Sequence, residues 1–577
     1  MKTQINTSFQ SSLSRRQWVE RVSLPLIGAS IGATIINNRA NAIPPMSHQE
    51  SNNDLGTRIY NIRDFGAKGD GSTLDTLALQ NAINACFNDG GGTVLVPAGI
   101  FQIGITELKS NVTLHISAGG MLLGSADGKQ YHAVDEIPLR GDSTLGDGNW
   151  ALLYAVNAKN VIVEGPGIID GQGHQFRSIE SGQPPPSGIG GRQRPYHLLL
   201  YRCENVIIRN LDLIRCAFHS IRVIQSRRVH MNNIYIHNRV NINNDGFHFV
   251  SCEYVTISNC TLLCQDDICA LFGSCKFVTV TNCVFSTRWS IFRFGGGSAQ
   301  NISVSNCIIY ETYGCPIKIS SSQSQMENMT FSNLILKDVT GPIGIGFSGT
   351  SGKGREDGGA DALPAPFVRN ISFTNIRATV VVGPPTEKEG QLMGRIYDGE
   401  QHSCITLNGV EDAIIENISF NDVHVTYAGG GSAELAAKRE IPQVAREYFG
   451  VWAEPPLGPP AYGFFARNVK GLTMNNIRFE VDNPDFRPAV IFNNVQDVVI
   501  NGLSVQGYPE AESLLRFSAT KDVLLTACRV ITPAAAFLQI EGTENENIKV
   551  DGGDLSKAVL PLVFKYGASN NSVKLRE

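Results

Sequence analysis

The sequence predicts a right-handed parallel β-helix, a solenoid in which the short strands of each coil stack on those of the next. A motif of the form Val/Ile-x-apolar-x-Asn recurs along the chain, as in VIIRN, VTISN and ISFTN. The Asn residues that close successive copies from Asn210 to Asn333 lie 23, 26, 23, 24 and 27 residues apart. Leucine-rich repeats have a similar period, but their leucine framework is absent from this sequence. Strands this short must stack on neighbouring coils to bury their apolar faces.

Each repeat consists of an alternating apolar strand followed by Asn, a residue that tolerates the left-handed backbone of a tight corner. The cysteines Cys260, Cys283 and Cys307 follow such corners at coil spacing. We therefore expect their side chains to form a ladder inside the solenoid.

The open end of a solenoid must be covered, because it exposes unpaired strand edges. The segment 75–87 has helical apolar spacing at Leu79, Ile83 and Phe87, and is followed by three glycines and a strand. It is the predicted N-terminal capping helix. Regular coils are expected over 58–347, and longer intervals over 348–577 predict loop insertions between the later coils.

The N-terminus resembles a twin-arginine export signal over residues 1–42. Arg15 and Arg16 precede an apolar run at 24–36, and Ala40-Asn41-Ala42 has the form of a cleavage site. The run is short for a bilayer span. We therefore expect one exported β-helix domain at 43–577, periplasmic or extracellular, with no membrane association after signal removal.

Composition favours neither a nucleic-acid partner nor a disulfide scaffold. The formal charge is −5, and no block of Lys and Arg exceeds a pair. Thirteen cysteines in a chain of this length are better explained as small core residues. No His/Cys cluster has zinc spacing. We predict a monomer without a metal or cofactor.

Three aspartates stand out in apolar surroundings: Asp245 in NNDGFHF, and Asp266 and Asp267 in QDDICAL. The separations of 21 and 22 residues are close to one coil, and stacked strands lie about 4.8 Å apart. Neighbouring carboxyl groups push their pKa values apart, which separates an acid from a base. Inverting glycosidases require such a pair. The alternative is a cluster of Asx-turns or a bound calcium ion.

Several stretches resemble glycoside hydrolase family 28, the polygalacturonase-like β-helix enzymes, over about 60–347. They include DFGAKGDGSTLDTLALQNAINAC, GGGTVLVPAGIF, VEGPGIIDGQG, NNDG and, one coil later, QDD. The resemblance implies that Asp245 and Asp267 activate the attacking water and that Asp266 is the general acid.

Two motifs of that family are altered. The Gly-His-Gly motif falls on TRWSIFRFGGG, which has no His, and counting 21 residues from Asp267 reaches Arg288. The Arg-Ile-Lys motif falls on Pro316-Ile317-Lys318 and keeps the Lys. In polygalacturonases these basic residues are associated with the galacturonate carboxylate, so the departures put the identity of the sugar in doubt.

Five side chains near the acids are candidate substrate-binding groups. Arg288, Arg293 or Lys318 can replace the missing cation, because these side chains hydrogen-bond carboxylates. Solvation or ion pairing to the aspartates is the structural alternative. Asn243 precedes the first Asp, and alternation with its phenylalanine neighbours turns His248 outward.

The sequence thus predicts an exported inverting glycoside hydrolase that cleaves a pectic or related polysaccharide or oligosaccharide, with uronate or rhamnose units. Insertions that close one end of the groove favour exo action. One alternative is a calcium-dependent lyase of the same fold, with Arg288 or Lys318 as the base. The other is a non-catalytic glycan-binding β-helix.

Overall fold

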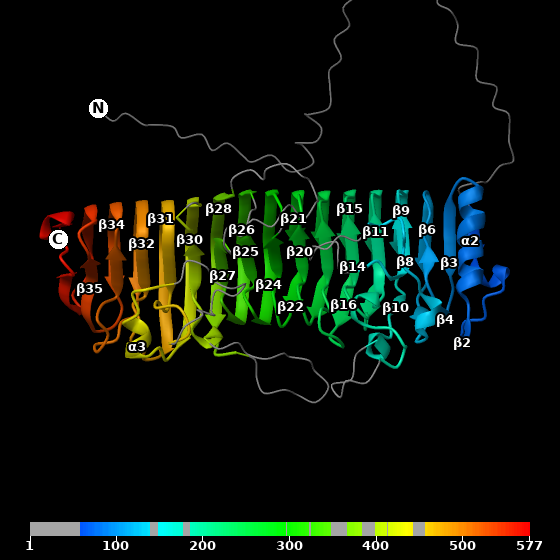
Figure 1. Cartoon of the computed structure of the whole chain (residues 1–577), viewed down its shortest axis with the longest axis horizontal. Coiled ribbons are helices and arrows are strands. Elements are labelled where there is room, and N and C mark those ends of the chain that lie inside the picture. The colour runs from blue at the N-terminus through cyan, green and yellow to red at the C-terminus, as the bar shows by residue number, and fades with distance from the viewer. Residues whose placement is uncertain are drawn as a thin grey trace, which may run out of the picture. The chain divides into compact units, whose positions relative to one another are not determined.

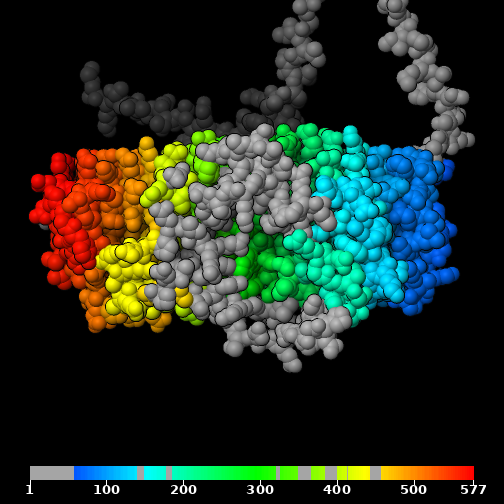
Figure 2. Space-filling model, in the orientation of Figure 1, coloured from blue at the N-terminus to red at the C-terminus, as the bar shows by residue number. Residues whose placement is uncertain are grey.

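The computed structural model describes residues 58–138, 148–176, 185–295, 297–321, 325–347, 366–383, 399–411, 413–441 and 456–576. The predicted export signal at 1–42 lies outside the described residues. Residues Asp54–Glu577 form one compact unit. Its strands stack coil upon coil in sequence order, as predicted for a right-handed parallel β-helix (Figure 1). Figure 2 shows the same order as adjacent bands of colour from blue to red.

Three parallel sheets run along the solenoid, one for each strand of a coil. The sheet that carries the site, called the site sheet below, contains β5 (Thr106–Glu107), β8 (Ala151–Val156), β11 (Tyr196–Tyr201), β14 (Ile221–Ile224), β17 (Phe247–Val250), β20 (Cys269–Phe272), β23 (Phe292–Gly295), β25 (Ile317–Ser321), β27 (Ile343–Phe347), β29 (Ile405–Asn408), β33 (Leu515–Ser518), β35 (Ala534–Glu541) and β37 (Ala558–Lys565). The first residues of β31 and β32 also pair with it.

The other two sheets complete each coil. The second contains β1 (Ile59–Asn61), β3 (Gly92–Val96), β6 (Val112–Ile116), β9 (Lys159–Glu164), β12 (Glu204–Arg209), β15 (Arg227–Asn232), β18 (Glu253–Ser258), β21 (Lys276–Thr281), β24 (Ala299–Tyr313), β26 (Gln325–Thr340), β28 (Phe367–Val380), β30 (Ile415–Gly429), β31 (Phe464–Asn483), β32 (Val490–Val505), β34 (Lys521–Val530), β36 (Glu546–Asp554) and β38 (Val573–Arg576). The third contains β2 (Asp70–Leu74), β4 (Gly99–Ile103), β7 (Gly120–Gly124), β10 (Ile168–Asp170), β13 (Asp212–Ile214), β16 (Tyr235–Asn238), β19 (Thr261–Cys264) and β22 (Val284–Ser286), and the second halves of β24 and β26 continue it.

The Asn residues that close the repeats turn the chain at each corner in the left-handed conformation, as predicted. Asn210, Asn233, Asn306 and Asn333 all have φ between 51° and 59°. Their amides also bond between coils, since Asn233 donates to Asn210 and Asn333 to Asn306, both at 3.0 Å. The corners therefore stack as hydrogen-bonded ladders that fix the coil register.

The solenoid interior holds the alternating apolar side chains and the predicted cysteine ladder. Thr261 pairs with Val284, and Val284 with Ile308, which places Cys260, Cys283 and Cys307 in register. All thirteen cysteines lie in the described part of the chain, buried and free of disulfides.

Helix α2 (Thr76–Asn88) covers the first coil at the blue end of Figure 1 and confirms the predicted cap. It buries Leu79 and Ile83. Asp75, the residue that precedes the helix, accepts hydrogen bonds from the backbone N–H groups of Lys68 and Gly69 through its carboxylate. None of the described helices is long and apolar enough to cross a membrane.

Two inserted segments pack outside the solenoid core. Val134 and Ile137 form an apolar cluster with Tyr196 and Leu199 of the site sheet. In the later coils, the described parts of the insertions include the helix α3 (Ala433–Ala436).

Candidate active site

The outward face of the site sheet carries a column of polar residues across the middle coils. The register aligns Arg222 of β14 with His248 of β17, and Arg293 of β23 with Lys318 of β25. Ala270 of β20 lies between the two pairs. The neighbours of these residues along each strand, such as Phe247 and Phe249, fill the core. Because side chains alternate along a strand, the column points out of the solenoid.

The three aspartates lie in the bends just before two of these strands. Asp245 precedes β17, and Asp266 and Asp267 occupy the turn between β19 and β20. The Gly246 amide donates to the Asp267 carbonyl oxygen at 2.9 Å, which places Asp245 and Asp267 at equivalent positions on consecutive coils. Since the pair lies in a turn, strand alternation does not force either member into the core. The predicted one-coil relationship is confirmed.

The Asp266 carboxylate is held by two donors. Asn243 donates its side-chain amide to Oδ2 at 3.1 Å, and the Asp267 backbone N–H donates to Oδ1 at 3.0 Å. Burial raises the pKa of Asp266, although these hydrogen bonds and the nearby Lys318 and Arg293 oppose the shift.

Asp267 is the more deeply buried member of the pair, with 7% exposure. Burial, followed by the neighbouring Asp266 carboxylate, raises the pKa of Asp267 to about 7, against the opposing charges of Arg293 and Lys318. The pair therefore retains a proton at a pH where an ordinary carboxyl group is ionised.

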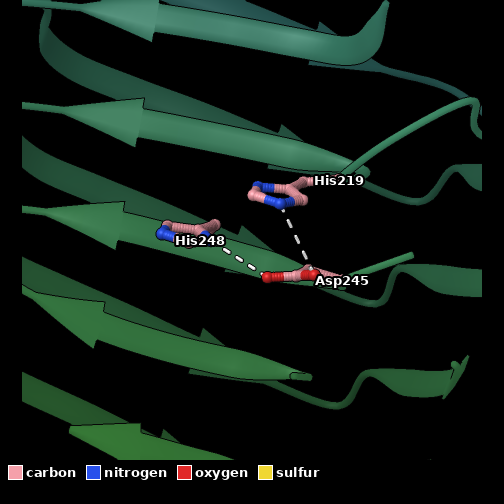
Figure 3. A group of neighbouring side chains, drawn as sticks. All are labelled: His219, Asp245 and His248. Carbon is pink, nitrogen blue, oxygen red and sulfur yellow. Dashed lines mark hydrogen bonds and ion pairs between the residues drawn. The ribbon is translucent and has the colours of Figure 1, made fainter. Parts of the chain in front are cut away.

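Two imidazoles flank Asp245, one from its own coil and one from the coil before (Figure 3). His248 Nδ1 lies 3.0 Å from Asp245 Oδ2, and His219 Nε2 lies 3.5 Å from Oδ1. The two rings are stacked, with centroids 4.5 Å apart and an interplanar angle of 3°. All three residues are buried.

Arg222 lies behind this group and is fully buried. Its Nη1 is 3.5 Å from His219 Nδ1 and 3.4 Å from the Tyr196 hydroxyl. Burial holds the pKa values of His219 and His248 well below the usual range, and the Arg222 charge adds to both shifts. Both imidazoles are therefore neutral at neutral pH.

Arg293 and Lys318 lie on the other side of the acidic pair. Arg293 Nε is 3.9 Å from Asp267 Oδ2, and Lys318 Nζ lies 5.2 Å from the centre of the Trp289 ring. Both side chains are buried, and the charges of both act on Asp266 and Asp267. The structure thus places these two predicted cations beside the acids.

Arg288 is held elsewhere. Its guanidinium binds the carboxylate of Glu400 through Nη2 at 3.1 Å and Nη1 at 3.4 Å, and Thr340 donates to the same carboxylate at 2.6 Å. The coil step after Asp267 is 23 residues, because Cys269 pairs with Phe292, so Ser290 rather than Arg288 follows Asp267. The count of 21 was wrong here because coil length varies.

Asn243 connects Asp266 of the acidic pair to Arg194. Its φ is 57°, its side-chain amide donates to Asp266, and its side-chain oxygen accepts from Arg194 at 3.2 Å. The structure therefore places Asn243 against the acid that the family resemblance makes the proton donor.

Sequence reasoning missed His219, Arg222 and Glu400. His219 lies 26 residues before Asp245, and 26 is one of the intervals between the repeat asparagines. Counting one coil backward as well as forward from Asp245 would have found it. Glu400 follows a long insertion, so no period relates it to Arg288.

His219, Asp245 and His248 are also the only group of three or more His, Cys, Asp and Glu side chains, among the described residues, whose ligand atoms lie within 4.8 Å of one another.

Two curated proteins show the relationship in sequence. A probable polygalacturonase of Vitis vinifera is 31% identical over 215 residues, which cover 36% of this chain and 43% of that protein. An exo-poly-alpha-D-galacturonosidase of Dickeya chrysanthemi is 30% identical over 250 residues, covering 36% and 41% respectively. The match spans about two fifths of the length of these relatives.

Solved structures show the same fold. The family 28 exopolygalacturonase of Yersinia enterocolitica aligns with a TM-score of 0.54 at 20% identity, covering 77% of this chain and 79% of that one. An exopolygalacturonase from Thermotoga maritima aligns with a TM-score of 0.53 at 20% identity, covering 73% and 92%. The model of glycosyl hydrolases family 28 matches residues 86–387, just over half of the sequence. The chain therefore belongs to glycosyl hydrolases family 28.

Proposed function

We propose that the protein is an inverting glycoside hydrolase that removes units from the end of a galacturonate-containing pectic glycan. The observation that carries this proposal is the carboxyl group of Asp267, whose pKa is raised to about 7 one coil from Asp245. A site of this kind holds a proton donor and an ionised base together near neutral pH.

The reaction needs one carboxyl group that protonates the departing oxygen and one carboxylate that takes a proton from water. The family pattern assigns the donor to Asp266 and the base to Asp245 with Asp267. The raised pKa values of both members of the pair support a proton stored in the pair, and the deeper burial of Asp267 favours it as the group that holds this proton before substrate enters. Asp245 then serves as the base on the neighbouring coil.

The charge of the site supports an anionic sugar. Arg293 and Lys318 follow one another on the outward face of the site sheet, next to the acids. Buried cations of this kind hydrogen-bond strongly to a carboxylate that replaces water in the site. We therefore propose a uronate in the subsite beside Asp267.

Exo action is supported by inserted segments on both sides of the acids. Toward the N-terminus, Val134 and Ile137 cover Tyr196 and Leu199. Toward the C-terminus, Arg467 donates to the Ile441 carbonyl oxygen at 2.7 Å, and Arg516 donates to that of Ala436 at 2.6 Å. Segments that lie across the outward face limit the length of glycan the face accommodates. The Dickeya and Yersinia relatives are named as exo-acting enzymes.

We further propose export by the twin-arginine route, from Arg15 and Arg16, and action as a monomer on a periplasmic or extracellular glycan, without membrane association after signal removal. Inhibition of twin-arginine export, with the precursor followed by its mass, tests this part.

A calcium-dependent lyase is the main alternative. It needs a basic side chain that abstracts a proton, and Arg288 is engaged with the buried carboxylate of Glu400, which counts against that role. A non-catalytic glycan-binding solenoid would have no use for a carboxyl pair with raised pKa values.

The test is digestion of oligogalacturonides, rhamnogalacturonan oligosaccharides and neutral glycans of defined length by the purified protein. We expect products one water heavier than the eliminated forms, release from one chain end, and inversion at the new anomeric carbon by proton NMR. An unsaturated product that forms only with calcium would establish the lyase instead. Binding without turnover on every glycan would establish the non-catalytic solenoid.

A further inference from the structure

The buried group around Asp245 is not explained by acid–base chemistry alone. A general base needs one carboxylate that can reach water, whereas here two imidazoles and a fully buried arginine surround it. Four buried ionisable side chains in one place are costly unless their contacts serve a purpose.

We propose that His219 and His248 are positioning residues that hold the Asp245 carboxylate ionised and fix the orientation of its two oxygens, with Arg222 setting the tautomer of His219. The proposal rests on the function proposed above, in which Asp245 is the base that activates water.

The tautomer of each imidazole follows from its partners. Arg222 can only donate, so His219 Nδ1 accepts and its proton lies on Nε2, which faces Asp245 Oδ1 at 3.5 Å. Asp245 Oδ2 accepts from His248, so the His248 proton lies on Nδ1. Each oxygen of Asp245 thus faces one imidazole N–H group, which fixes the direction of both oxygens.

The charges that face the group are consistent with this arrangement. Arg222 on β14 and Arg194 on the segment before β11 both disfavour a charged His219, and Arg222 does the same for His248. On the next coil, Asp266 and Asp267 disfavour further negative charge. Two neutral N–H donors stabilise the Asp245 carboxylate without adding a formal charge to the site.

A shared metal ion fits the rings poorly. An imidazole nitrogen binds a metal through a lone pair in the ring plane, but the planes of His219 and His248 are parallel within 3° and stacked at 4.5 Å. An ion between them would lie outside at least one plane. The rings also face different oxygens of Asp245. The geometry is that of a hydrogen-bonded carboxylate.

The ring stack supports the same assignment. Phe272 stacks on His248, with ring centroids 5.1 Å apart and an interplanar angle of 18°. The ring centroids of Phe218 and His219 are 4.3 Å apart. Aromatic neighbours fix the plane of each imidazole, so that its N–H direction is set before substrate binds.

The test compares His219→Phe and His248→Phe, which keep the stacked ring but remove the N–H, with His219→Gln and His248→Asn, which return an amide N–H near the lost one. We expect kcat to fall on the order of 10- to 100-fold in the Phe variants, with KM changed less than twofold, and the acidic limit of the kcat/KM profile to move up by about one pH unit. The Gln and Asn variants should recover most of both losses.

His230→Phe is the matched control, because His230 is a partly buried imidazole bonded to Thr256 on another sheet of the same coils. It should leave the pH profile unchanged. Thermal unfolding of every variant separates misfolding from lost positioning. An acidic limit that stays in place in folded, active His219→Phe and His248→Phe overturns the inference.

A neutron diffraction map of the wild-type protein needs neither turnover nor a variant. Deuterons on His219 Nε2 and His248 Nδ1, with none on Asp245, support the inference. A deuteron on Asp245, or stoichiometric zinc binding that His219→Gln abolishes, overturns it. Inactivity of the wild-type protein on every glycan would reject the proposed function instead.

Discussion

Asp245 and Asp267 occupy equivalent positions on consecutive coils, fixed by the hydrogen bond of 2.9 Å from the Gly246 amide to the Asp267 carbonyl oxygen. The spacing between the backbones of the two aspartates is thus set by the spacing of neighbouring strands, about 4.8 Å. Both aspartates lie in turns, but the backbone hydrogen bond between their coils and the strands that follow them hold the turns in place.

Replacing each aspartate in turn should separate the roles in the reaction. We expect Asp245→Asn, Asp266→Asn and Asp267→Asn each to lower kcat on the order of 100- to 10,000-fold on oligogalacturonides, because each removes an acid or a base. Asp497→Asn makes the same change on an exposed corner of a later coil and should leave kcat unchanged.

The proton donor can then be identified with an activated substrate. A glycoside with a good leaving group needs little protonation, so the donor variant should regain most of its rate on that substrate, whereas the base variants should not. Recovery in Asp266→Asn supports the family assignment, and recovery in Asp267→Asn supports the assignment from the raised pKa. Equal loss on both substrates in all three variants would contradict any acid–base division.

The raised pKa of Asp267 also predicts how stability and activity depend on pH. A carboxyl group with a higher pKa in the folded chain binds its proton more tightly there, so the free energy of unfolding falls as pH rises from the ordinary pKa of 3.8 toward about 7. Above that pH the buried charge costs up to about 4 kcal/mol. Activity that needs the proton falls over the upper part of the same range.

Asp267→Asn should therefore be inactive and yet more stable than the wild-type protein at pH 8, with a smaller or reversed difference at pH 4. Thermal unfolding at both values of pH provides the measurement, with Asp497→Asn as the control. A destabilised Asp267→Asn protein at pH 8 would show that the Asp267 carboxylate is well compensated when charged.

The repeat pattern was sufficient to predict the solenoid, because each Val/Ile-x-apolar-x-Asn unit encodes a strand and its corner locally. The left-handed φ of Asn210 and Asn333 and the ladder of Cys260, Cys283 and Cys307 follow directly from that pattern. The acidic cluster was predictable for the same reason, since 22 residues separate Asp245 from Asp267 and one coil separates their positions.

Interactions that cross a variable interval were not predictable. The partner of Arg288 is Glu400, which lies 112 residues away within the irregular intervals that follow Asn333, and no sequence period connects them. The shift from Arg288 to Ser290 above Asp267 arose from a coil two residues longer than the one assumed. Burial, which lowers the pKa values of His219 and His248, results from the packing of several coils and does not follow from the spacing of the repeats.

The packing around Gly246 leaves no room for a side chain. A Cβ atom there would lie 2.6 Å from Leu262 Cδ2 and 2.7 Å from the Ile268 carbonyl oxygen. Gly246→Ala should therefore destabilise the protein by about 1–3 kcal/mol and lower kcat by shifting Asp245 relative to Asp267. Denaturant unfolding and kcat on oligogalacturonides give the two readouts.

Gly542→Ala is the contrasting variant, because nothing lies within 4 Å of its added Cβ and only its φ of 80° is strained. It should lower stability while leaving kcat unchanged. A Gly246→Ala protein with wild-type kcat would indicate that the spacing of the two aspartates tolerates a shift of the backbone.

Loss of the charge of Lys318 should weaken substrate binding, whereas loss of the charge of Arg288 should lower stability. Lys318→Met is expected to raise KM for oligogalacturonides by about 10-fold or more, and to leave KM for a neutral oligosaccharide unchanged, because the lost cation faces the acidic pair. Lys470→Met, on an exposed position of β31, is the control for charge alone. An unchanged KM in Lys318→Met would remove the uronate from the subsite proposed here.

Arg288→Met should instead cost about 3–5 kcal/mol of stability, because it leaves the Glu400 carboxylate buried at 2% exposure without its guanidinium. The double variant Arg288→Met with Glu400→Gln removes both charges and should recover most of that loss. Chemical denaturation of the single and double variants measures the coupling. If Arg288→Met were stable and raised KM for the uronate substrate, Arg288 would bind the sugar rather than hold the insertion that carries Glu400 against the site sheet.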